Sequence, residues 1–386
     1  MRRTADVAVV GAGIYGCAIA HALSARRLRV AVLERESEPA AGPTRRSGAC
    51  TRQFYGDPRL SALSRESLEL AWNRWSAFTG LRDPEAEHDR CGTVVVAPPA
   101  SARGLSIIHL PPRVDAIDLF AANLRAGGTT AFETLGSPEL ARRFPFMRSR
   151  GLRGLWERDS GYMREPSGAA RDLARAARAR GATFHFGRPA TRVRHTGSGW
   201  SVETPAGPVA CGSLILAAGA WTAALLPFPL RRHTLRVARV RTSFLGGLPG
   251  PHPVVCDVAG GAYFRRRGAG LFAANLAAEP ATLRRPDDLD PRCDRYPLAE
   301  RAARNRFGSL AHAIPSGAAT IYDVNRLDGN PVVDQIAPGL FCAWLFSGHG
   351  FKFAPAVAAR LAEAVAADAT PRSLEAFAEA RTTGVS

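Results

Sequence analysis

The chain has 386 residues, of which 46% are hydrophobic and 22% charged, and its formal net charge is +17. The length suits two domains and the composition is that of a globular protein, while seven scattered cysteines without a C-x-x-C pair argue against a disulfide framework or a metal site. No later apolar run reaches the ~18 residues that a spanning helix needs, so we expect a cytoplasmic protein with no membrane partner.

The basic excess comes almost entirely from arginine. The arginines are spread along the chain rather than gathered in one tract, so we interpret the charge as a composition bias and expect no nucleic-acid partner. Lysine occurs once, at Lys352, among the 51 basic residues. Because the two side chains differ in shape, hydration and ability to lose a proton, a single lysine in such a chain indicates a site-specific role.

The first predicted unit is a strand, a helix and a second strand. Apolar, β-branched residues run from Asp6 to Val10 and from Leu28 to Leu33, and an amphipathic segment between them reaches Ala25. The first 25 residues superficially resemble a signal peptide. A glycine pattern inside the apolar run favours a buried βα unit instead.

This glycine pattern is G-x-G-x-x-G, formed by Gly11, Gly13 and Gly16. At a strand-to-helix turn these glycines permit a tight turn, close approach of a pyrophosphate and close helix packing, and the helix N-terminus attracts phosphate. Glu34 ends the second strand, where an acid accepts hydrogen bonds from a ribose 2′-hydroxyl and repels a 2′-phosphate. The unit predicts a site for FAD or NAD rather than NADP, and the motif alone does not separate the first two.

The elements that follow alternate between helices and strands. A polar loop rich in Gly and Pro covers residues 41–58. Periodicity then predicts helices at Leu60–Phe78, Ile117–Arg125, Ser137–Arg143 and Ser167–Arg180. It also predicts strands at Gly92–Ala97, Thr183–Phe186, Trp200–Thr204, Pro208–Cys211 and Ser213–Trp221.

From Pro227 to about Ile314 the pattern changes to short alternating strands separated by Pro/Gly turns, which predicts an antiparallel sheet. The expected strands are Arg236–Phe244, Ala262–Arg265 and Leu271–Asn275. The chain is then predicted to form a helix at Arg301–Ala313, a strand at Leu340–Leu345, a helix at Ala356–Ala367 and a frayed tail after Thr370.

Five stretches, spread over nearly the whole chain, resemble a known family of flavoproteins. They are Gly11 to Glu34, Arg52-Gln-Phe-Tyr55, Asp159 to Met163 with Pro166-Ser167, Leu214 to Trp221, and Tyr322 to Lys352. The family is that of the FAD-dependent amine and amino-acid oxidases, which includes D-amino-acid oxidase and glycine oxidase. The chain is most similar to the monomeric sarcosine oxidase branch of this family.

The resemblance implies an α/β fold with two domains. One would be a Rossmann-like FAD domain, and the other a substrate domain built on a mixed or antiparallel sheet. The FAD-binding domain would be discontinuous and comprise residues 1–80, 151–225 and 320–386. The substrate domain would comprise residues 81–150 and 226–319. Thr320 stands where the branch has the cysteine that tethers the flavin, so we expect noncovalent FAD.

The resemblance and the motif together assign the cofactor contacts to residues from both ends of the chain. These are Gly11, Gly13, Ile14, Tyr15, Gly16, Glu34, Arg35, Ser47, Gly48, Val193, Ala218, Gly219, Trp221, Gly348, Gly350, Phe351 and Lys352. Val193 resembles the residue that contacts adenine through its backbone. The turn at residues 348–351 precedes a helix, so its N–H groups and Lys352 would supply positive potential to the reduced flavin.

The resemblance assigns catalysis to Arg52, Lys352, Tyr263, Tyr322 and His349. Arg52 and Lys352 would clamp the carboxylate of an anionic substrate, because a buried cation pair is costly unless an anion completes it. The two tyrosines would line the substrate, or serve as half-buried sheet residues. His349 would bond the substrate or the flavin, or cap the helix.

We therefore expect oxidation of the C–N bond of a small amino acid or N-substituted amino acid to an imine, with O2 reduced to H2O2. The branch uses a separate lysine to assist O2, and this chain has none, so Arg265, Arg266 or Arg267 would replace it. Without such a cation the chain would be a dehydrogenase with another electron acceptor. A 2-hydroxy-acid oxidase and a noncatalytic basic flavoprotein that binds nucleic acid or another partner are the remaining alternatives, and we expect a monomer.

Overall fold

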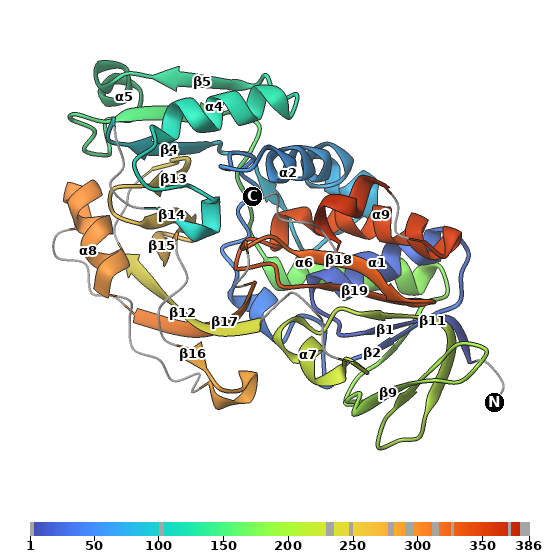
Figure 1. Cartoon of the computed structure of the whole chain (residues 1–386). Helices are drawn as coiled ribbons and strands as arrows, with labels where there is room; N and C mark the ends of the chain where they lie inside the picture. The colour runs from blue at the N-terminus through green and yellow to red at the C-terminus, as the bar shows by residue number, and fades with distance from the viewer. Residues whose placement is uncertain are drawn as a thin grey trace.

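The computed structural model describes residues 4–99, 104–228, 235–246, 250–276, 282–289, 297–310, 316–325, 328–369 and 372–378 (Figure 1). Two large sheets lie side by side, and each has helices against it (Figure 1). Within the described residues no helix is both long and apolar enough to cross a membrane. The same residues hold no group of three or more His, Cys, Asp and Glu side chains arranged to bind a metal ion.

The first sheet has a parallel centre with antiparallel additions. Its strands follow the order β18 (Val332–Ala337), β19 (Leu340–Trp344), β11 (Val209–Leu216), β1 (Ala5–Val10), β2 (Val30–Leu33) and β8 (Thr183–His185). Strands β19 to β8 run parallel, whereas β18 is antiparallel to β19. β10 (Trp200–Glu203) pairs with β11, and β9 (Arg192–His195) pairs with β10. The expected Rossmann-like sheet is therefore present.

The second sheet is antiparallel except where β4 and β13 pair. Its order is β16 (Thr282–Leu283), β12 (Leu235–Gly246), β15 (Gly270–Asn275), β14 (Ala262–Arg267), β13 (Val254–Asp257), β4 (Thr93–Ala97), β6 (Arg153–Glu157) and β5 (Phe132–Leu135). β17 (Ser316–Asn325) pairs with β12 along its whole length. A further two-stranded sheet joins β3 (His88–Asp89) to β7 (Tyr162–Met163).

The helices are α1 (Ile14–Ala25), α2 (Pro58–Leu70), α3 (Trp75–Thr79), α4 (Ala116–Ala126), α5 (Ser137–Arg143), α6 (Pro166–Ala179), α7 (Thr222–Leu225), α8 (Pro297–Arg306) and α9 (Ala354–Ala367). Helices α1, α6 and α9 share one apolar core with the first sheet (Figure 1). The second sheet packs against α8 on one face and α4 on the other. These two-sided cores explain why the central strands read as continuous apolar runs.

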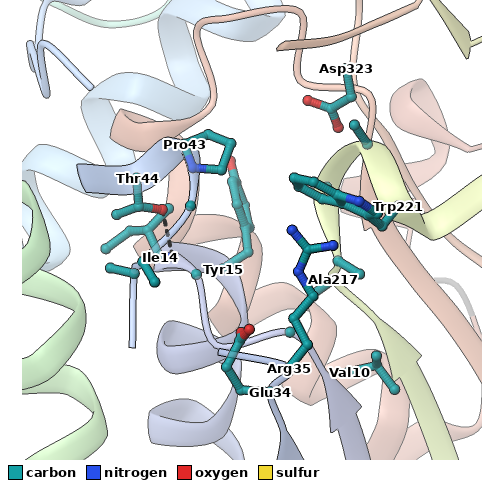
Figure 2. Close-up of a pocket in the computed structure, with 18 of the residues that line it drawn as sticks. Val10, Ile14, Tyr15, Glu34, Arg35, Pro43, Thr44, Ala217, Trp221 and Asp323 are labelled. Carbon is teal, nitrogen blue, oxygen red and sulfur yellow. Dashed lines mark hydrogen bonds between the residues drawn. The ribbon is translucent and has the colours of Figure 1, made fainter. Parts of the chain in front are cut away.

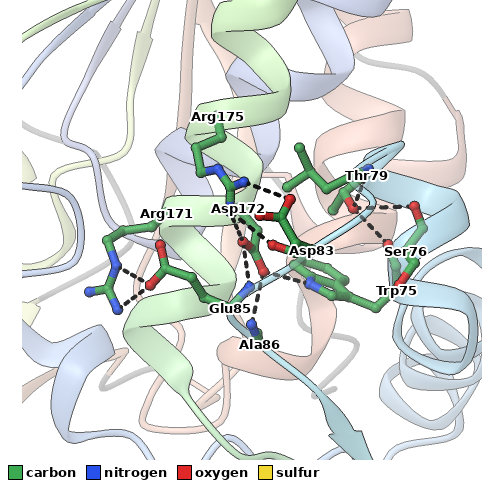
Figure 3. Close-up of polar contacts among 10 residues, drawn as sticks. Trp75, Ser76, Thr79, Asp83, Glu85, Ala86, Arg171, Asp172 and Arg175 are labelled. Atoms are coloured by element: carbon green, nitrogen blue, oxygen red, sulfur yellow. Dashed lines mark hydrogen bonds and ion pairs between the residues drawn. The ribbon is translucent and has the colours of Figure 1, made fainter.

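A buried carboxylate joins α6 to the segment that follows α2 (Figure 3). Asp172, on α6, is fully buried and accepts hydrogen bonds from Trp75 Nε1 (2.9 Å) and from the backbone N–H groups of Glu85 (2.9 Å) and Ala86 (3.0 Å). Arg175, one turn further along α6, lies 3.4 Å from the same carboxylate. The carboxylate thus satisfies several buried donors at one point, which a buried charge requires.

One predicted helix and two predicted strands differ from the structure. The helix expected at Leu60–Phe78 is interrupted at Ala71 (φ −135°, ψ −60°) and continues as a 3-10 turn at Trp72–Arg74 and then as α3. The interruption lets Trp72 donate to the carbonyl of Lys352 while it stacks on Trp75, a tertiary constraint that overrides helical periodicity. The two strands expected at Pro208–Cys211 and Ser213–Trp221 form the single strand β11, which ends at Leu216.

Several elements near the C-terminus also shift. The helix expected at Arg301–Ala313 begins earlier, with Pro297 as its first residue, and ends at Arg306, and residues 311–313 lie outside the described part of the chain. A 3-10 helix at Arg372–Phe377 replaces part of the expected frayed tail, with Leu374 and Phe377 buried in the core. Strands β6 and β17 belong to the second sheet, whereas the predicted division assigns residues 151–157 and 320–325 to the FAD domain. The domain division as a whole stays a prediction.

Candidate active site

A cavity of ≈ 400 Å³ opens at the carboxyl ends of the parallel strands (Figure 2). Val10, Leu33 and Ala217 line it at the ends of β1, β2 and β11. This edge is where ligands bind in doubly wound sheets. The opposite wall comes from the C-terminal part of the chain, between Ile321 and Phe351. The cavity therefore joins segments from both ends of the sequence.

The glycine turn forms the phosphate end of the cavity. Gly11 has φ +102°, and a Cβ placed on it would lie 2.6 Å from the carbonyl oxygen of Ala217. A Cβ on Gly16 would lie 1.7 Å from the carbonyl oxygen of Gly11, so helix and strand touch directly at that point. Gly13 caps α1 and lines the cavity together with Ile14 and Tyr15, so the N-terminus of the helix and its dipole face the cavity. The N–H of Ile14 donates to Thr44 Oγ1 (3.2 Å).

Glu34 is held against this turn. Its Oε2 accepts a hydrogen bond from the backbone N–H of Ala12 (2.6 Å), and its Oε1 accepts one from the backbone N–H of Glu36 (3.0 Å). The carboxylate lines the cavity immediately after β2 (Figure 2). An acceptor in this place suits the hydroxyl groups of a ribose.

The far end of the cavity is a tight turn that follows β19. Leu345, Ser347 and Gly348 all have positive φ, at +59°, +51° and +85°. Asp323 holds this turn, because its Oδ2 accepts the backbone N–H of Leu345 (2.6 Å) and its carbonyl accepts that of Ser347 (2.9 Å). Burial raises the pKa of Asp323 to about 6. The carboxyl group also lines the cavity, where Figure 2 shows it directed inward.

Two cations lie buried beyond that turn. Arg52 and Lys352 are 3% and 5% exposed, and both face the ring of Tyr55, with the Arg52 guanidinium carbon 4.2 Å and the Lys352 Nζ 5.7 Å from its centroid. Arg52 donates to the carbonyls of Phe54 (2.7 Å) and Ile107 (3.0 Å). Lys352 Nζ donates to the carbonyl of His349 (3.0 Å). Burial, followed by the charge of Arg52, moves the pKa of Lys352 well below its ordinary value.

Glu157 is the buried acid that supports the arginine. It is fully buried on β6, and both of its oxygens lie within hydrogen-bond distance of the backbone N–H of Gln53 (2.9 and 3.1 Å). The carboxyl group thus holds the segment that carries Arg52. Burial is the main reason that the pKa of Glu157 rises to about 7.

Replacing Glu157 with glutamine is expected to flatten the pH dependence of stability. Because the folded-state pKa is raised, the proton on Glu157 stabilises the folded state fully below about pH 4.5, and this contribution is lost as pH rises to about 7. The shift corresponds to about 3 kcal/mol. Thermal unfolding of the wild type and Glu157→Gln between pH 4.5 and 8 measures it, with Glu133→Gln on the neighbouring strand as control. Parallel pH profiles for the wild type and Glu157→Gln would contradict the assignment.

His349 lies beside the cations with one ring nitrogen unused. Its Nε2 lies 3.2 Å from the carbonyl oxygen of Gly329, which can only accept, so Nε2 carries the proton. Burial, together with the charges of His109, Lys352 and Arg52, lowers the pKa of His349 well below its ordinary value, so the ring is neutral. Its Nδ1 is buried without a hydrogen-bond partner. An unpaired buried acceptor is costly, which makes Nδ1 a candidate to bind a ligand.

Two tyrosines pack against glycines of the site. A Cβ on Gly48 would lie 2.3 Å from Tyr263 Oη, and a Cβ on Gly348 would lie 2.4 Å from the ring of Tyr322. Burial raises the pKa of Tyr263, and it raises that of Tyr322 to about 12, so both phenols stay protonated. Each glycine therefore admits a neutral phenol at close range.

Most of the predicted cofactor contacts line this one cavity. They are Gly11, Gly13, Ile14, Tyr15, Glu34, Arg35, Ser47, Ala218, Gly219, Trp221, Gly348, Gly350 and Phe351, and the predicted catalytic Tyr322 joins them. Gly16 instead sets the helix–strand contact, and Gly48 adjoins Tyr263. Lys352 follows Phe351 and lies with Arg52 and His349 beyond the cavity wall. The roles of all these residues in binding or catalysis stay predictions.

Val193 does not line the cavity, and its predicted backbone contact with adenine stays a prediction. Its side chain, on β9, is buried in an apolar core of the first sheet, and the preceding residues Pro189, Ala190 and Thr191 line the cavity. Sequence reasoning also missed Asp323 and Glu157. Asp323 directly follows Tyr322, and that adjacency was the available signal, whereas Glu157 sits in the unpredicted strand β6.

The cavity fits a flavin dinucleotide. A glycine turn at a helix N-terminus and a fixed carboxylate at the end of β2 match a pyrophosphate and a ribose. At the other end, the glycines at 348 and 350 leave a wall of backbone and the Phe346 ring, which stacks on Tyr15 with centroids 3.8 Å apart. Such a wall suits a flat ring system.

Comparisons with known proteins agree with this geometry. The sequence signature of the family described as "FAD dependent oxidoreductase" (DAO) matches residues 6–364. The chain is 27% identical over 400 residues to monomeric sarcosine oxidase from Streptomyces avermitilis, covering 98% of this chain and 97% of that protein. L-proline dehydrogenase from P. horikoshii has the same fold, with a TM-score of 0.82, 19% identity and 98% coverage of both chains.

Glycine oxidase from Geobacillus kaustophilus also shares this fold, with a TM-score of 0.80 at 20% identity, covering 98% of this chain and 99% of that one. Because the family signature spans nearly the whole sequence and the cavity fits its cofactor, the chain belongs to the DAO family of FAD-dependent oxidoreductases.

Proposed function

We propose that the chain oxidises the C–N bond of a small, anionic amino acid or N-substituted amino acid to an imine. The observation that carries this proposal is the buried pair of cations, Arg52 and Lys352, against the ring of Tyr55. Two buried positive charges are costly unless an anion completes the site. A carboxylate would compensate both charges, because charge-assisted hydrogen bonds are stronger than neutral ones and arginine can bind a carboxylate with two N–H groups.

The position of Lys352 next to a residue of the cofactor cavity supports this role. Lys352 follows Phe351, which lines the cavity, and the indole of Trp72 anchors the Lys352 carbonyl (2.8 Å). A substrate held there would sit between the cavity end and the second sheet, which contributes Tyr263. Sarcosine and glycine, the substrates in the names of two similar proteins, are small and carry a carboxylate.

The flavin supplies the acceptor for a hydride equivalent when it is bound. The neighbouring residues would bind and orient the substrate and keep its nitrogen uncharged. Arg52 and Lys352 bind the carboxylate, and their charges disfavour an ammonium group nearby, so the neutral amine with its lone pair is the form that is held. His349 Nδ1, an acceptor without a partner in the structure, receives an N–H of that amine. Tyr263 and Tyr322 would line this side of the substrate.

An anaerobic substrate screen that follows bleaching of the flavin absorbance tests the proposal. Small primary and N-methyl amino acids are expected to bleach the flavin, while matched amines without a carboxylate fail at the same concentration. Equal bleaching by the decarboxylated amines would contradict the proposal that Arg52 and Lys352 bind a substrate carboxylate. Bleaching by 2-hydroxy acids but by no amino acid would favour the hydroxy-acid oxidase, the second candidate on this scaffold.

We propose O2 as the electron acceptor, with Arg265 as the cation that assists it. Arg265 is 4% exposed, whereas Arg266 and Arg267 are exposed to solvent. Tyr263 and Arg265 are two residues apart on β14, so their side chains share a face of the sheet. The guanidinium carbon of Arg265 lies 4.6 Å from the ring centroid of Tyr162. A buried cation stabilises the negative charge that forms when oxygen is reduced.

Replacing Arg265 with methionine is expected to slow reoxidation in air by about tenfold, the effect of losing one positioned charge worth about 1.4 kcal/mol. The anaerobic rate of flavin reduction should change less than twofold, because the clamp residues are untouched. Stopped-flow measurements of both half-reactions check this, with Arg267→Met on the same strand as control. A wild-type reoxidation rate no faster than that of free flavin would instead make the chain a dehydrogenase with another acceptor.

A further inference from the structure

Residues 282–289, which include strand β16 of the second sheet, lie against the outer wall of the cofactor cavity. Leu283, on β16, and Leu289 pack on a small apolar cluster formed by Ala220, Val237 and Ile321. Ala220 and Ile321 also line the cavity. The segment is thus packed directly behind residues that form the wall.

The same segment makes polar contacts at the edge of the cavity. Asp287, in a 3-10 turn at Pro286–Asp288, accepts a hydrogen bond from Trp221 Nε1 (2.9 Å) and one from Arg35 Nη1 (3.0 Å). Arg35 and Trp221 both line the cavity, and the Arg35 guanidinium carbon lies 4.0 Å from the centroid of the Trp221 ring. One carboxylate therefore holds both members of a stacked pair.

The stacked pair connects two different walls. Arg35 follows Glu34 at the end of β2, whereas Trp221 closes the 3-10 turn at Gly219–Trp221 that follows β11. In Figure 2 the guanidinium of Arg35 points toward the indole of Trp221. Since Glu34 is the ribose acceptor of the site, the pair lies at the adenosine end of the cavity.

We propose that residues 282–289 form a strap that retains FAD, with Asp287 as the residue that holds the Arg35–Trp221 pair closed. FAD leaves its cavity only when that pair separates, and the carboxylate opposes the separation. The inference rests on FAD as the cofactor of the family and not on the proposed substrate, so it survives any outcome of the substrate screen.

The strap is sensitive to ionic strength. The side chains of Arg35 and Asp287 are 40% and 64% exposed, so salt screens their attraction. The hydrogen bond from the Trp221 indole and the Arg35 guanidinium together lower the pKa of Asp287, so the carboxylate is charged at neutral pH. Flavin release from the wild type should therefore speed up with added salt.

The test measures how fast FAD leaves the holoprotein, from the rise of free-flavin fluorescence after dilution. Asp287→Ala is expected to release FAD about five times faster than the wild type, the effect of losing one partly exposed charged contact. Trp221→Phe keeps a ring for Arg35 to stack on but lacks the Nε1–H, and it should show a similar acceleration. Glu69→Ala removes an equally exposed partner of an arginine on α2 and should leave release unchanged.

The double variant decides whether the two side chains act through their hydrogen bond. If they do, Asp287→Ala combined with Trp221→Phe releases FAD about five times faster than the wild type, not about twenty-five times. Salt between roughly 20 mM and 500 mM should accelerate release from the wild type and leave Asp287→Ala nearly unaffected. Unchanged release in Asp287→Ala, or multiplicative effects in the double variant, would overturn the strap.

Discussion

Replacing Lys352 with methionine is expected to reduce kcat/KM for an amino-acid substrate by roughly 10²–10³-fold while FAD stays bound. Truncating one partner of a buried, charge-assisted contact costs about 3–4 kcal/mol, and Lys352 would provide one of the two cations for the carboxylate. FAD should remain because the cavity wall at this point is made by Gly350 and Phe351 rather than by the lysine side chain.

The same substitution is not expected to unfold the protein. Burial and the charge of Arg52 already push the pKa of Lys352 downward, which means that the folded structure disfavours the charged ammonium. Methionine of similar length removes that cost, so the thermal midpoint should equal or exceed that of the wild type. The hydrogen bond to the His349 carbonyl is lost in exchange.

A matched substrate pair separates the clamp from other roles of Lys352. An amine analogue without a carboxylate should be turned over equally slowly by the wild type and by Lys352→Met, because neither protein then uses the lysine. Steady-state kinetics with both compounds, together with the flavin content of each preparation, measure the effect. Normal turnover of the amino acid by the variant would disprove the clamp.

Replacing Asp172 with alanine is expected to lower the stability of the protein by about 3–5 kcal/mol, the range seen when a buried, multiply bonded charge is removed. The substitution leaves the Trp75 indole and the N–H groups of Glu85 and Ala86 without their acceptor (Figure 3), and the bonds from Trp75 and Ala86 are buried. It also opens a void between α6 and α3.

Thermal unfolding of the holoprotein measures this prediction, with a drop in the midpoint of roughly 4–6 °C expected. Asp83→Ala is the matched control, since Asp83 is 87% exposed and pairs with the same Arg175. Its loss should move the midpoint by less than about 1 °C, because exposed ion pairs contribute little. Equal midpoints for the two variants would show that Asp172 is not a structural anchor.

The N-terminal nucleotide unit could be predicted because its signals are local. The strand, glycine turn and helix at residues 5–25 depend on β-branched runs and on three glycines, and the structure shows these elements within a residue or two of their expected ends. Gly11 and Gly16 act through steric contacts with neighbours in the same unit or beside it. Local chemistry of this kind is readable from spacing alone.

Edge and pairing strands were harder to predict. β9, β17 and β18 carry arginine, polar or glycine residues that break the alternating pattern. These segments become strands because they pair with β10, β12 and β19. The interruption of the helix at Ala71 has a similar origin, since Trp72 turns toward the Lys352 carbonyl from across the fold. Long-range contacts decided these elements against their local propensity.

Local sequence signals were enough to predict the nucleotide-binding turn and the mainly antiparallel second sheet, and they singled out Lys352 as a candidate site residue. The folded structure was needed to show that Arg52 and Lys352 both lie near the ring of Tyr55, that Glu157 holds the segment carrying the arginine and that Asp287 reaches the cavity edge. The physical reason is distance along the chain. Side chains that are 50 to 300 residues apart meet only after helices and sheets have packed, and no local pattern encodes which pairs will touch.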